Sequence, residues 1–317
     1  MERFRRCLPL TAALGALLAL ALCPDAAAVS ARGGLRLCAQ MLVPSLLPFF
    51  VVSGLLRRMG LPGLLGRIAE PVTMRLFGLS GAGASALLLG LTGGYPLGAA
   101  AVGDMTRDGL LTPEEAERVL PLCNNSGPAF LIGAAGTGVF HDRALGLQLY
   151  LTHILAALVL GVLLAPREKQ KKPPQRAVIR SLGVSEALPE AVRGAIDATL
   201  TVCGFAVTFS VLSGMLDAAG TLGSAASALA EAFETDTQAV RSLLTGILEL
   251  GSGIGAMQGL APTKQNAAIA AFLIGFGGVS VHCQTAAVLA GTGVGLKKHL
   301  WGRVLHGILA AAMMLVI

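Results

Sequence analysis

The chain has 317 residues, of which 54% are hydrophobic and only 13% charged, with a mean hydropathy of +0.72. Because a soluble domain carries about 25% charged residues and a disordered chain needs low hydrophobicity and high charge, this composition excludes both classes. The net charge of +6 does not indicate nucleic-acid binding, since the basic residues lie in short clusters beside apolar runs, where they set membrane topology.

The cysteines are scattered singly, without CxxC pairs or histidine partners at zinc spacing, so the sequence predicts neither a disulfide framework nor a metal site. The six positions are Cys7, Cys23, Cys38, Cys123, Cys203 and Cys283. The 41 glycines are nearly twice the number expected from the usual share of about 7%. In apolar helices they indicate close packing, helix breaks, or both.

The N-terminal region 1–34 contains a first apolar run at 8–23, preceded by three arginines and followed by Ala26, Ala27 and Ala28. This pattern is typical of a cleaved signal peptide or of a signal anchor. Either one would place residue 24 outside the cytoplasm.

Apolar runs of about 20 residues can cross the roughly 30 Å of bilayer hydrocarbon as helices. The sequence therefore predicts an all-α polytopic membrane protein of the bacterial cell membrane. Nine such runs occur, at 8–23, 35–56, 79–103, 119–140, 144–165, 194–216, 240–258, 265–290 and 300–317.

Charges between the runs predict the topology of the first half, because basic loops stay in the cytoplasm. The basic cluster 57–75 and the basic linker 167–189 are predicted to be cytoplasmic, and the acid-rich stretch 104–117 to be outside. Only one net crossing then remains for the two apolar runs 119–140 and 144–165, so one of them is predicted to be re-entrant. The better candidate is 119–140, because the turn-forming segment 123–128 splits it. Thr112 and Glu115 have the spacing of a capping box before its first arm.

The second half repeats this reasoning. Acidic residues predict that 217–236 lies outside, whereas Lys264 and the cluster Lys297, Lys298 and Arg303 are predicted to be inside. The run 265–290, interrupted at 275–280, then becomes a second re-entrant hairpin. The chain is predicted to form two inverted repeats, 35–166 and 190–317, each with a broken transmembrane helix and a re-entrant helical hairpin.

The two predicted broken spans carry the strongest functional signals. Gly93-Gly94-Tyr95-Pro96 interrupts the run 79–103, and Glu249-Leu250-Gly251 interrupts 240–258. Glu249 is the one acid in the middle of an apolar run, and such a residue suggests an ion ligand, a proton carrier or a solute contact. The alternative is a structural glutamate bonded to loose backbone.

The predicted hairpin tips add amide, hydroxyl and imidazole groups that suit a polar neutral ligand. For His282 the alternative is a packed, hydrogen-bonded histidine, and for the glycines it is tight helix packing. No catalytic residue, metal ligand or cofactor is predicted. The predicted solute site comprises Gly94, Tyr95, Pro96, Asn124, Asn125, Ser126, Glu249, Gly278, Ser280, His282 and Gln284.

Several of these segments resemble the nucleoside recognition or Gate domain proteins, in particular those of the sporulation integral membrane type. The matching pieces are 94–99, 125–128 with Phe130 and Gly133, the Glu249 segment, and 275–281 with Gln284. The Gate group is similar to concentrative nucleoside transporters and to the membrane part of ferrous iron transporters. The resemblance implies moving or sensing a small solute, in spore-forming bacteria, without naming the solute.

The leading hypothesis is therefore a transporter or permease, with the lipid bilayer and a small polar solute as partners and an ion or proton as coupling species. Assembly into a homo-oligomer is compatible with the pattern. A second hypothesis is a membrane assembly or signalling protein that keeps a transporter-like fold without transport. An enzyme is not predicted, because Ser280 and His282 are neighbours in the chain and no P-loop or HExxH motif is present.

Overall fold

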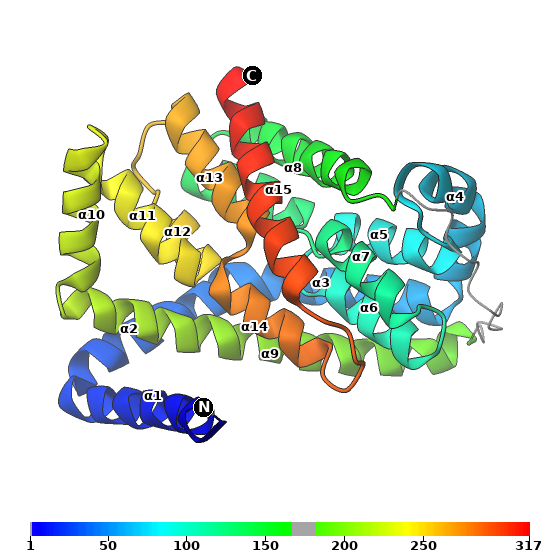
Figure 1. The fold of residues 1–317 in the computed structure, drawn as a ribbon, viewed down its shortest axis with the longest axis horizontal. Coiled ribbons are helices and arrows are strands. Elements are labelled where there is room, and N and C mark those ends of the chain that lie inside the picture. Colours follow the sequence, from blue (N-terminus) through cyan, green and yellow to red (C-terminus); the bar gives the residue numbers. More distant parts are fainter. Residues whose placement is uncertain (1, 167–181) are drawn as a thin grey trace.

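A computed structural model describes residues 2–166 and 182–317, and in this part of the chain every regular element is helical (Figure 1). The predicted all-α class is confirmed. Most of the predicted linker 167–189 lies outside the described residues, and its last part already belongs to α9. The first half contains α1 (Glu2–Leu22), α2 (Pro24–Leu37), the π-helix η1 (Cys38–Leu42), α3 (Val43–Arg58), α4 (Leu61–Phe77), α5 (Gly81–Gly93), α6 (Leu97–Arg107), α7 (Pro113–Cys123), the π-helix η2 (Ala129–Val139) and α8 (Arg143–Leu163).

The second half contains α9 (Val184–Ala218), α10 (Thr221–Ala232), α11 (Thr237–Leu248), α12 (Leu250–Gly255), α13 (Lys264–Phe276), α14 (Gly278–Val288) and α15 (Lys297–Val316). Four stretches of the described chain are long and apolar enough to cross a membrane, and the number rises to six if two sharply bent helix pairs are each counted as one span. Not every one of the nine apolar runs is therefore a simple crossing.

The long helix α9 packs antiparallel to the continuous helix formed by α2, η1 and α3. Gly34 faces Val207 and Ser210, and Gly54 faces Ala191. A Cβ atom at residue 34 would lie 3.0 Å from the Val207 Cα atom, so glycine allows the two backbones to approach closely. This pair forms one side of the molecule (Figure 1). The predicted boundary at residue 34 falls inside α2.

Helices α5 and α6 form a helical hairpin, whereas the sequence predicts one broken transmembrane helix at 79–103. The start of α5 lies beside the start of α7, because the Ser80 amide donates to the Glu115 carboxylate over 2.7 Å. The end of α6 at Arg107 is also close to the start of α7 at Pro113, because only a short loop joins them. Near the tip, a Cβ atom at Gly98 would lie 3.1 Å from the Gly90 Cα atom. The chain therefore turns back at 94–96.

Helix α7 and η2 continue in one direction across a break, whereas the sequence predicts a hairpin at 119–140. At one end Glu117 pairs with Lys298 at the start of α15 over 2.8 Å. At the other end η2 leads into α8, whose Thr152 hydroxyl donates to the Met314 sulfur near the end of α15. The segment therefore runs from one end of α15 towards the other. The Thr112 side chain accepts from the Glu115 amide at 3.2 Å, as one half of the predicted capping box requires.

The same exchange occurs in the second half. Gln238 at the start of α11 donates to the Ala256 carbonyl after α12 over 2.8 Å, and Gly253 packs directly on Gly246. Helices α11 and α12 therefore form the hairpin. Helices α13 and α14 together form one span, Lys264–Val288, which is interrupted at Gly277 with a φ angle of 94°. The prediction of a re-entrant 265–290 is wrong, because the break bends the helix without reversing it.

These assignments move two charged segments to the opposite face. Arg57 forms an ion pair with Asp104. The acid-rich stretch 104–117 therefore lies on the same side of the molecule as the basic cluster 57–75, although the sequence predicts that the two lie on opposite sides of the membrane. Lys264 donates to the Val316 carbonyl over 3.5 Å and thus lies where α15 ends. Acidic side chains contribute little to topology. The sign of the charge in these loops therefore does not reveal a hairpin whose two ends lie on the same side of the molecule.

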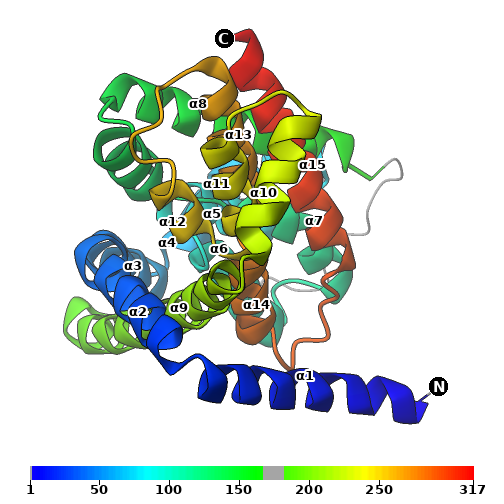
Figure 2. The same ribbon diagram turned by 90° about the vertical axis from the view of Figure 1, so that its left-hand side faces the viewer.

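Helix α1 stands apart from this body, at 102° to α2 in the stretch Ala13–Leu42 (Figure 2). The exposed apolar side chains of α1 include Leu14, Leu17, Leu18 and Leu22. The body has two large hydrophobic cores, and two smaller clusters join η1 to α9 and α10 to α11. One large core lies around α5, α6 and α7, and the other around η2, α13 and the end of α15.

Candidate functional site

All four interruptions of the helices meet in the centre of the molecule. The first hairpin tip touches the break after α7, since a Cβ atom at Gly94 would lie 2.8 Å from the Gly127 amide nitrogen. The second tip touches the break between α13 and α14, where a Cβ atom at Gly278 would lie 3.1 Å from the Leu250 nitrogen. Positive φ angles of 83° at Gly94 and 75° at Gly278 allow these turns.

Two further contacts join the halves. The Asn124 amide donates to the Thr285 hydroxyl over 2.8 Å, and the Tyr95 hydroxyl donates to the Ile274 carbonyl over 3.0 Å. Both contacts are buried. Peptide groups freed by helix breaks must find protein partners or line a cavity inside a membrane. The Ile274 carbonyl, just before the break at Gly277, finds such a partner in Tyr95 of the other half.

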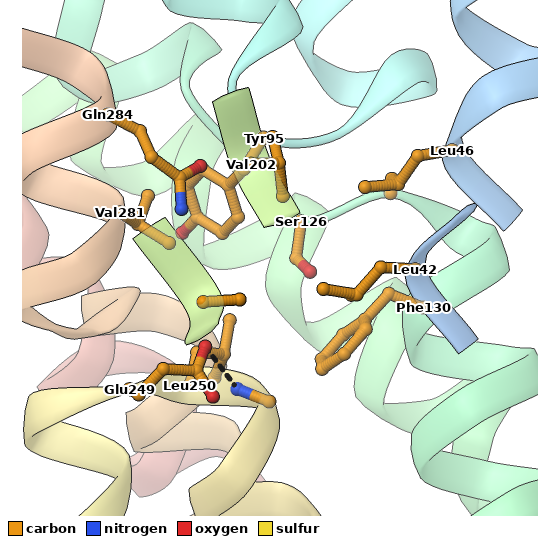
Figure 3. A pocket seen from close by; sticks show the side chains of 13 residues that line it. Leu42, Leu46, Tyr95, Ser126, Phe130, Val202, Glu249, Leu250, Val281 and Gln284 are labelled. Atoms are coloured by element: carbon orange, nitrogen blue, oxygen red, sulfur yellow. Dashed lines mark hydrogen bonds between the residues drawn. The ribbon is translucent and has the colours of Figure 1, made fainter. Parts of the chain in front are cut away.

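A pocket lies where the interruptions meet (Figure 3). It leaves a volume of about 50 Å³ for the centres of water-sized molecules, which is room for about three or four waters. Four predicted site residues line it: Tyr95, Ser126, Glu249 and Gln284. The remaining wall consists of Leu42, Leu46, Gly127, Phe130, Val202, Ala206, Leu250, Gly251 and Val281.

Glu249 has the structural role that the sequence leaves open, and it also lines the pocket. Its carboxylate caps α12, accepting hydrogen bonds from the Gly251 amide at 3.0 Å and the Ser252 amide at 2.5 Å. The same carboxylate lines the pocket and is 5% exposed. A buried carboxylate bonded to two amides can still accept a hydrogen bond from a solute or hold a cation. The structural role therefore does not exclude a functional one.

Other predicted site residues lie near the pocket without lining it. Asn125 donates to the Leu122 carbonyl, which holds the unwound segment after α7 in place. Ser280 accepts from the Gln284 amide at 3.3 Å, so it orients a pocket residue. His282 packs against the Phe276 and His299 rings, with centroids 4.8 and 5.4 Å away. The ring is packed, but neither of its nitrogens has a hydrogen-bond partner among the described residues, so the alternative of a packed, hydrogen-bonded histidine is met only in its packing. Gly94, Pro96, Asn124 and Gly278 shape the turns and contacts around the pocket.

Arg303 is not the cytoplasmic marker that the sequence suggests. It lies inside α15, is 0% exposed, and reaches the first hairpin tip by donating to the Tyr95 hydroxyl. It also donates to the Asn125 side-chain oxygen at 3.1 Å. Its proximity in sequence to Lys297 and Lys298 made it resemble a loop charge.

Sequence reasoning also missed three buried histidines. His153 on α8 stacks on His306 with ring centroids 4.4 Å apart, and its Nε2 atom accepts from the Ser126 amide at 3.1 Å. His299 and His306 share one face of α15 with Arg303. The spacing 299, 303, 306 follows the i, i+4, i+7 pattern of one helix face and could have revealed them. Among the described residues, no group of three or more His, Cys, Asp or Glu side chains is placed to hold a metal ion.

Comparisons with known proteins agree with the motifs. Residues 39–166 match the family model of the Gate domain, described as nucleoside recognition. The chain is 28% identical over 319 residues to the sporulation integral membrane protein YlbJ of Bacillus subtilis (strain 168), covering 93% of this chain and 78% of YlbJ. A solved structure of a CNTnw variant in an outward-facing state aligns with a TM-score of 0.48 and 15% identity, over 88% of this chain and 75% of that one.

The predicted resemblance and the multi-pass bacterial membrane location are both confirmed. Residues 39–166 match the Gate nucleoside recognition model, and the chain is similar over most of its length to the integral membrane protein YlbJ.

Proposed function

We propose that this protein is a transporter that moves a small polar solute through the central pocket. The observation that carries the proposal is that two hairpin tips and two helix breaks, drawn from both halves of the chain, meet at one buried pocket. Interrupted helices that enclose a site near the middle of the membrane are typical of secondary transporters. Tyr95, Ser126 and Gln284 would bind polar groups of the solute, and Glu249 would bind a donor group, a proton or a coupling cation.

The proposal includes two inverted repeats. In each half a long helix is followed by a shorter helix, a hairpin, a broken crossing and a final helix: α2 to α8 in the first half and α9 to α15 in the second. The antiparallel packing of α9 on α2 and α3 supports an inversion between the halves. Alternating access to one central site follows naturally from such symmetry.

The comparisons suggest where to look for the solute. The description of the Gate domain makes nucleosides the first class to test, and the name of the relative suggests a role during sporulation. Coupling to an ion or proton and assembly into homo-oligomers remain predictions. A transporter would need no ATP site of its own if the gradient of the ion or of the solute drives it.

Uptake into proteoliposomes tests the proposal. Radiolabelled uridine and adenosine, followed by amino acids, sugars and carboxylic acids, would be offered to the wild type and to the Glu249→Gln and Asn125→Ala variants. We expect at least a tenfold loss of flux in both variants. The matched controls are Glu231→Gln, an exposed acid on α10, and Asn266→Ala at the start of α13. Unchanged flux in folded Glu249→Gln and Asn125→Ala would refute this site.

The alternative, an assembly or signalling protein without transport, makes a different prediction. No solute of the panel would cross the membrane or stabilise the protein, and a partner protein would co-purify in fixed stoichiometry. Flux of any one solute that depends on Glu249 would exclude it.

A further inference from the structure

Arg303 is a buried cation without an acidic partner in the described parts of the chain. The side chain is 0% exposed, and the ion pairs found there involve other basic residues. Burying a guanidinium in a membrane protein is costly unless hydrogen bonds replace its water shell. Each bond that Arg303 makes therefore marks a contact that the fold depends on.

The guanidinium joins three separate segments. One terminal nitrogen donates to the Tyr95 hydroxyl on the first hairpin tip and to the Ile274 carbonyl in α13, at 3.4 Å for the latter. The other donates to the Asn125 side chain at 3.1 Å and to the Pro121 carbonyl at 3.4 Å. All these acceptors are neutral. A planar fork with five donors can span such a set, whereas the single ammonium of lysine cannot.

The bonded tyrosine is itself part of the pocket wall. Tyr95 lines the pocket (Figure 3). It donates its hydroxyl hydrogen to the Ile274 carbonyl at 3.0 Å and presents its ring 5.4 Å from the guanidinium carbon of Arg303. The hydroxyl can therefore accept from Arg303 while donating to Ile274. Both bonds fix the same ring, so the position of this wall depends on Arg303.

A second chain of hydrogen bonds leads from Arg303 to another pocket residue. Because a guanidinium only donates, the His306 Nδ1 atom accepts at 2.7 Å from the terminal nitrogen that also bonds Asn125, and the two hydrogens of that nitrogen are shared among His306, Asn125 and the more distant Pro121 carbonyl. The His306 Nε2 atom donates to the His153 carbonyl at 3.0 Å. The His153 Nε2 atom in turn accepts from the Ser126 amide at 3.1 Å. Ser126 lines the pocket. Arg303 thus reaches the pocket through Tyr95 and through the two histidines.

We propose that Arg303 is a positioning residue that holds Tyr95 and the unwound segment 124–128 as one rigid wall of the pocket. The effect of Arg303 on solute flux rests on the proposed function. Its effect on the rigidity of the pocket wall does not depend on transport, so an experiment can contradict one of these two claims and leave the other intact. Arg303 acts from behind the wall and does not line the pocket itself.

Hydrogen exchange measured by mass spectrometry on the full-length protein in nanodiscs tests this without any solute. In Arg303→Lys we expect amide exchange in segments 93–97 and 124–128 to become about tenfold faster, because charge-assisted bonds to both are lost. Tyr95→Phe should accelerate 93–97 alone. The effects of the two changes on exchange at 93–97 should be less than additive in the double variant, since both break the bond between Arg303 and Tyr95, while Tyr95→Phe also removes the bond to Ile274. The second hairpin tip, 249–253, should keep its wild-type exchange rate.

The chain offers matched controls. Tyr150→Phe removes the other tyrosine hydroxyl, which bonds to the Leu91 carbonyl, and Arg107→Lys alters an exposed arginine at the end of α6. Neither should change exchange at 93–97. Wild-type exchange in Arg303→Lys, an equal rise at 249–253, or additive effects in the double variant would each overturn the proposal. If Arg303→Lys does not fold, Tyr95→Phe decides, because unchanged exchange at 93–97 would overturn the proposal by itself.

Discussion

The Tyr95 hydroxyl, on the tip of the first hairpin, donates a 3.0 Å hydrogen bond to the Ile274 carbonyl in the other half of the chain. The contact links residues 179 positions apart in sequence. It brings a pocket-lining residue from the first half against the broken crossing of the second. The pocket therefore exists only when both halves are assembled, and the predictions below follow from this arrangement.

The first prediction separates the two roles of Glu249. Glu249→Ser should keep the helix cap, because a serine hydroxyl also accepts from the first amides of a helix, and should change the free energy of unfolding by about 1 kcal/mol or less. It removes the carboxylate from the pocket, so we expect flux to fall at least tenfold. Thermal unfolding and proteoliposome uptake measure the two effects. A parallel loss of stability and flux would indicate that Glu249 is structural only.

The second prediction concerns the close packing at the first hairpin. In Gly98→Ala the new Cβ atom would lie 2.0 Å from the Cys123 carbonyl oxygen, and the backbone on both sides cannot move aside easily. We expect a destabilisation of about 1–3 kcal/mol, read from thermal or denaturant unfolding. Gly133→Ala is the matched control, since no atom lies within 4 Å of its Cβ position. Equal stabilities of the two variants would contradict the observed hairpin packing.

The third prediction tests which segments are hairpins. Single cysteines at Asp108 and Lys297, both exposed, should react with a membrane-impermeant maleimide from one side of sealed vesicles. Cysteines at Arg143 and Thr235 should react from the other side. All four would be placed in a background without native cysteines. Labelling of positions 108 and 297 from opposite sides would instead support the topology that the loop charges predict, and it would exclude a hairpin at 81–107.

The sequence was sufficient to locate the interruptions. Glycine, proline and polar residues at 93–96, 123–128, Glu249 and 275–280 break apolar helices for reasons that are local, and the structure interrupts a helix at each of these places. Four of the predicted site residues line the pocket for the same reason, since polar groups at helix breaks must face a cavity or a partner.

Whether the chain reverses at a break is not a local property. The segments around Gly94 and Gly277 are both rich in glycine. The chain reverses at Gly94, because α6 packs back on α5, whereas it only bends at Gly277, where α14 packs against other helices. Loop charges could not correct this, since Asp104 pairs with Arg57 on one face. The sequence does not distinguish Arg303, a buried arginine inside a helix, from an arginine in a cytoplasmic loop, because Lys297 and Lys298 lie close to it in the chain.

Uptake of a solute panel by proteoliposomes containing wild type or Glu249→Ser tests the central claim most directly, namely that both halves enclose one transport site. We predict that at least one solute accumulates with the wild type and that Glu249→Ser, with an unchanged unfolding midpoint, accumulates it at least tenfold more slowly. Equal accumulation of that solute by the two proteins would contradict a transport site at Glu249.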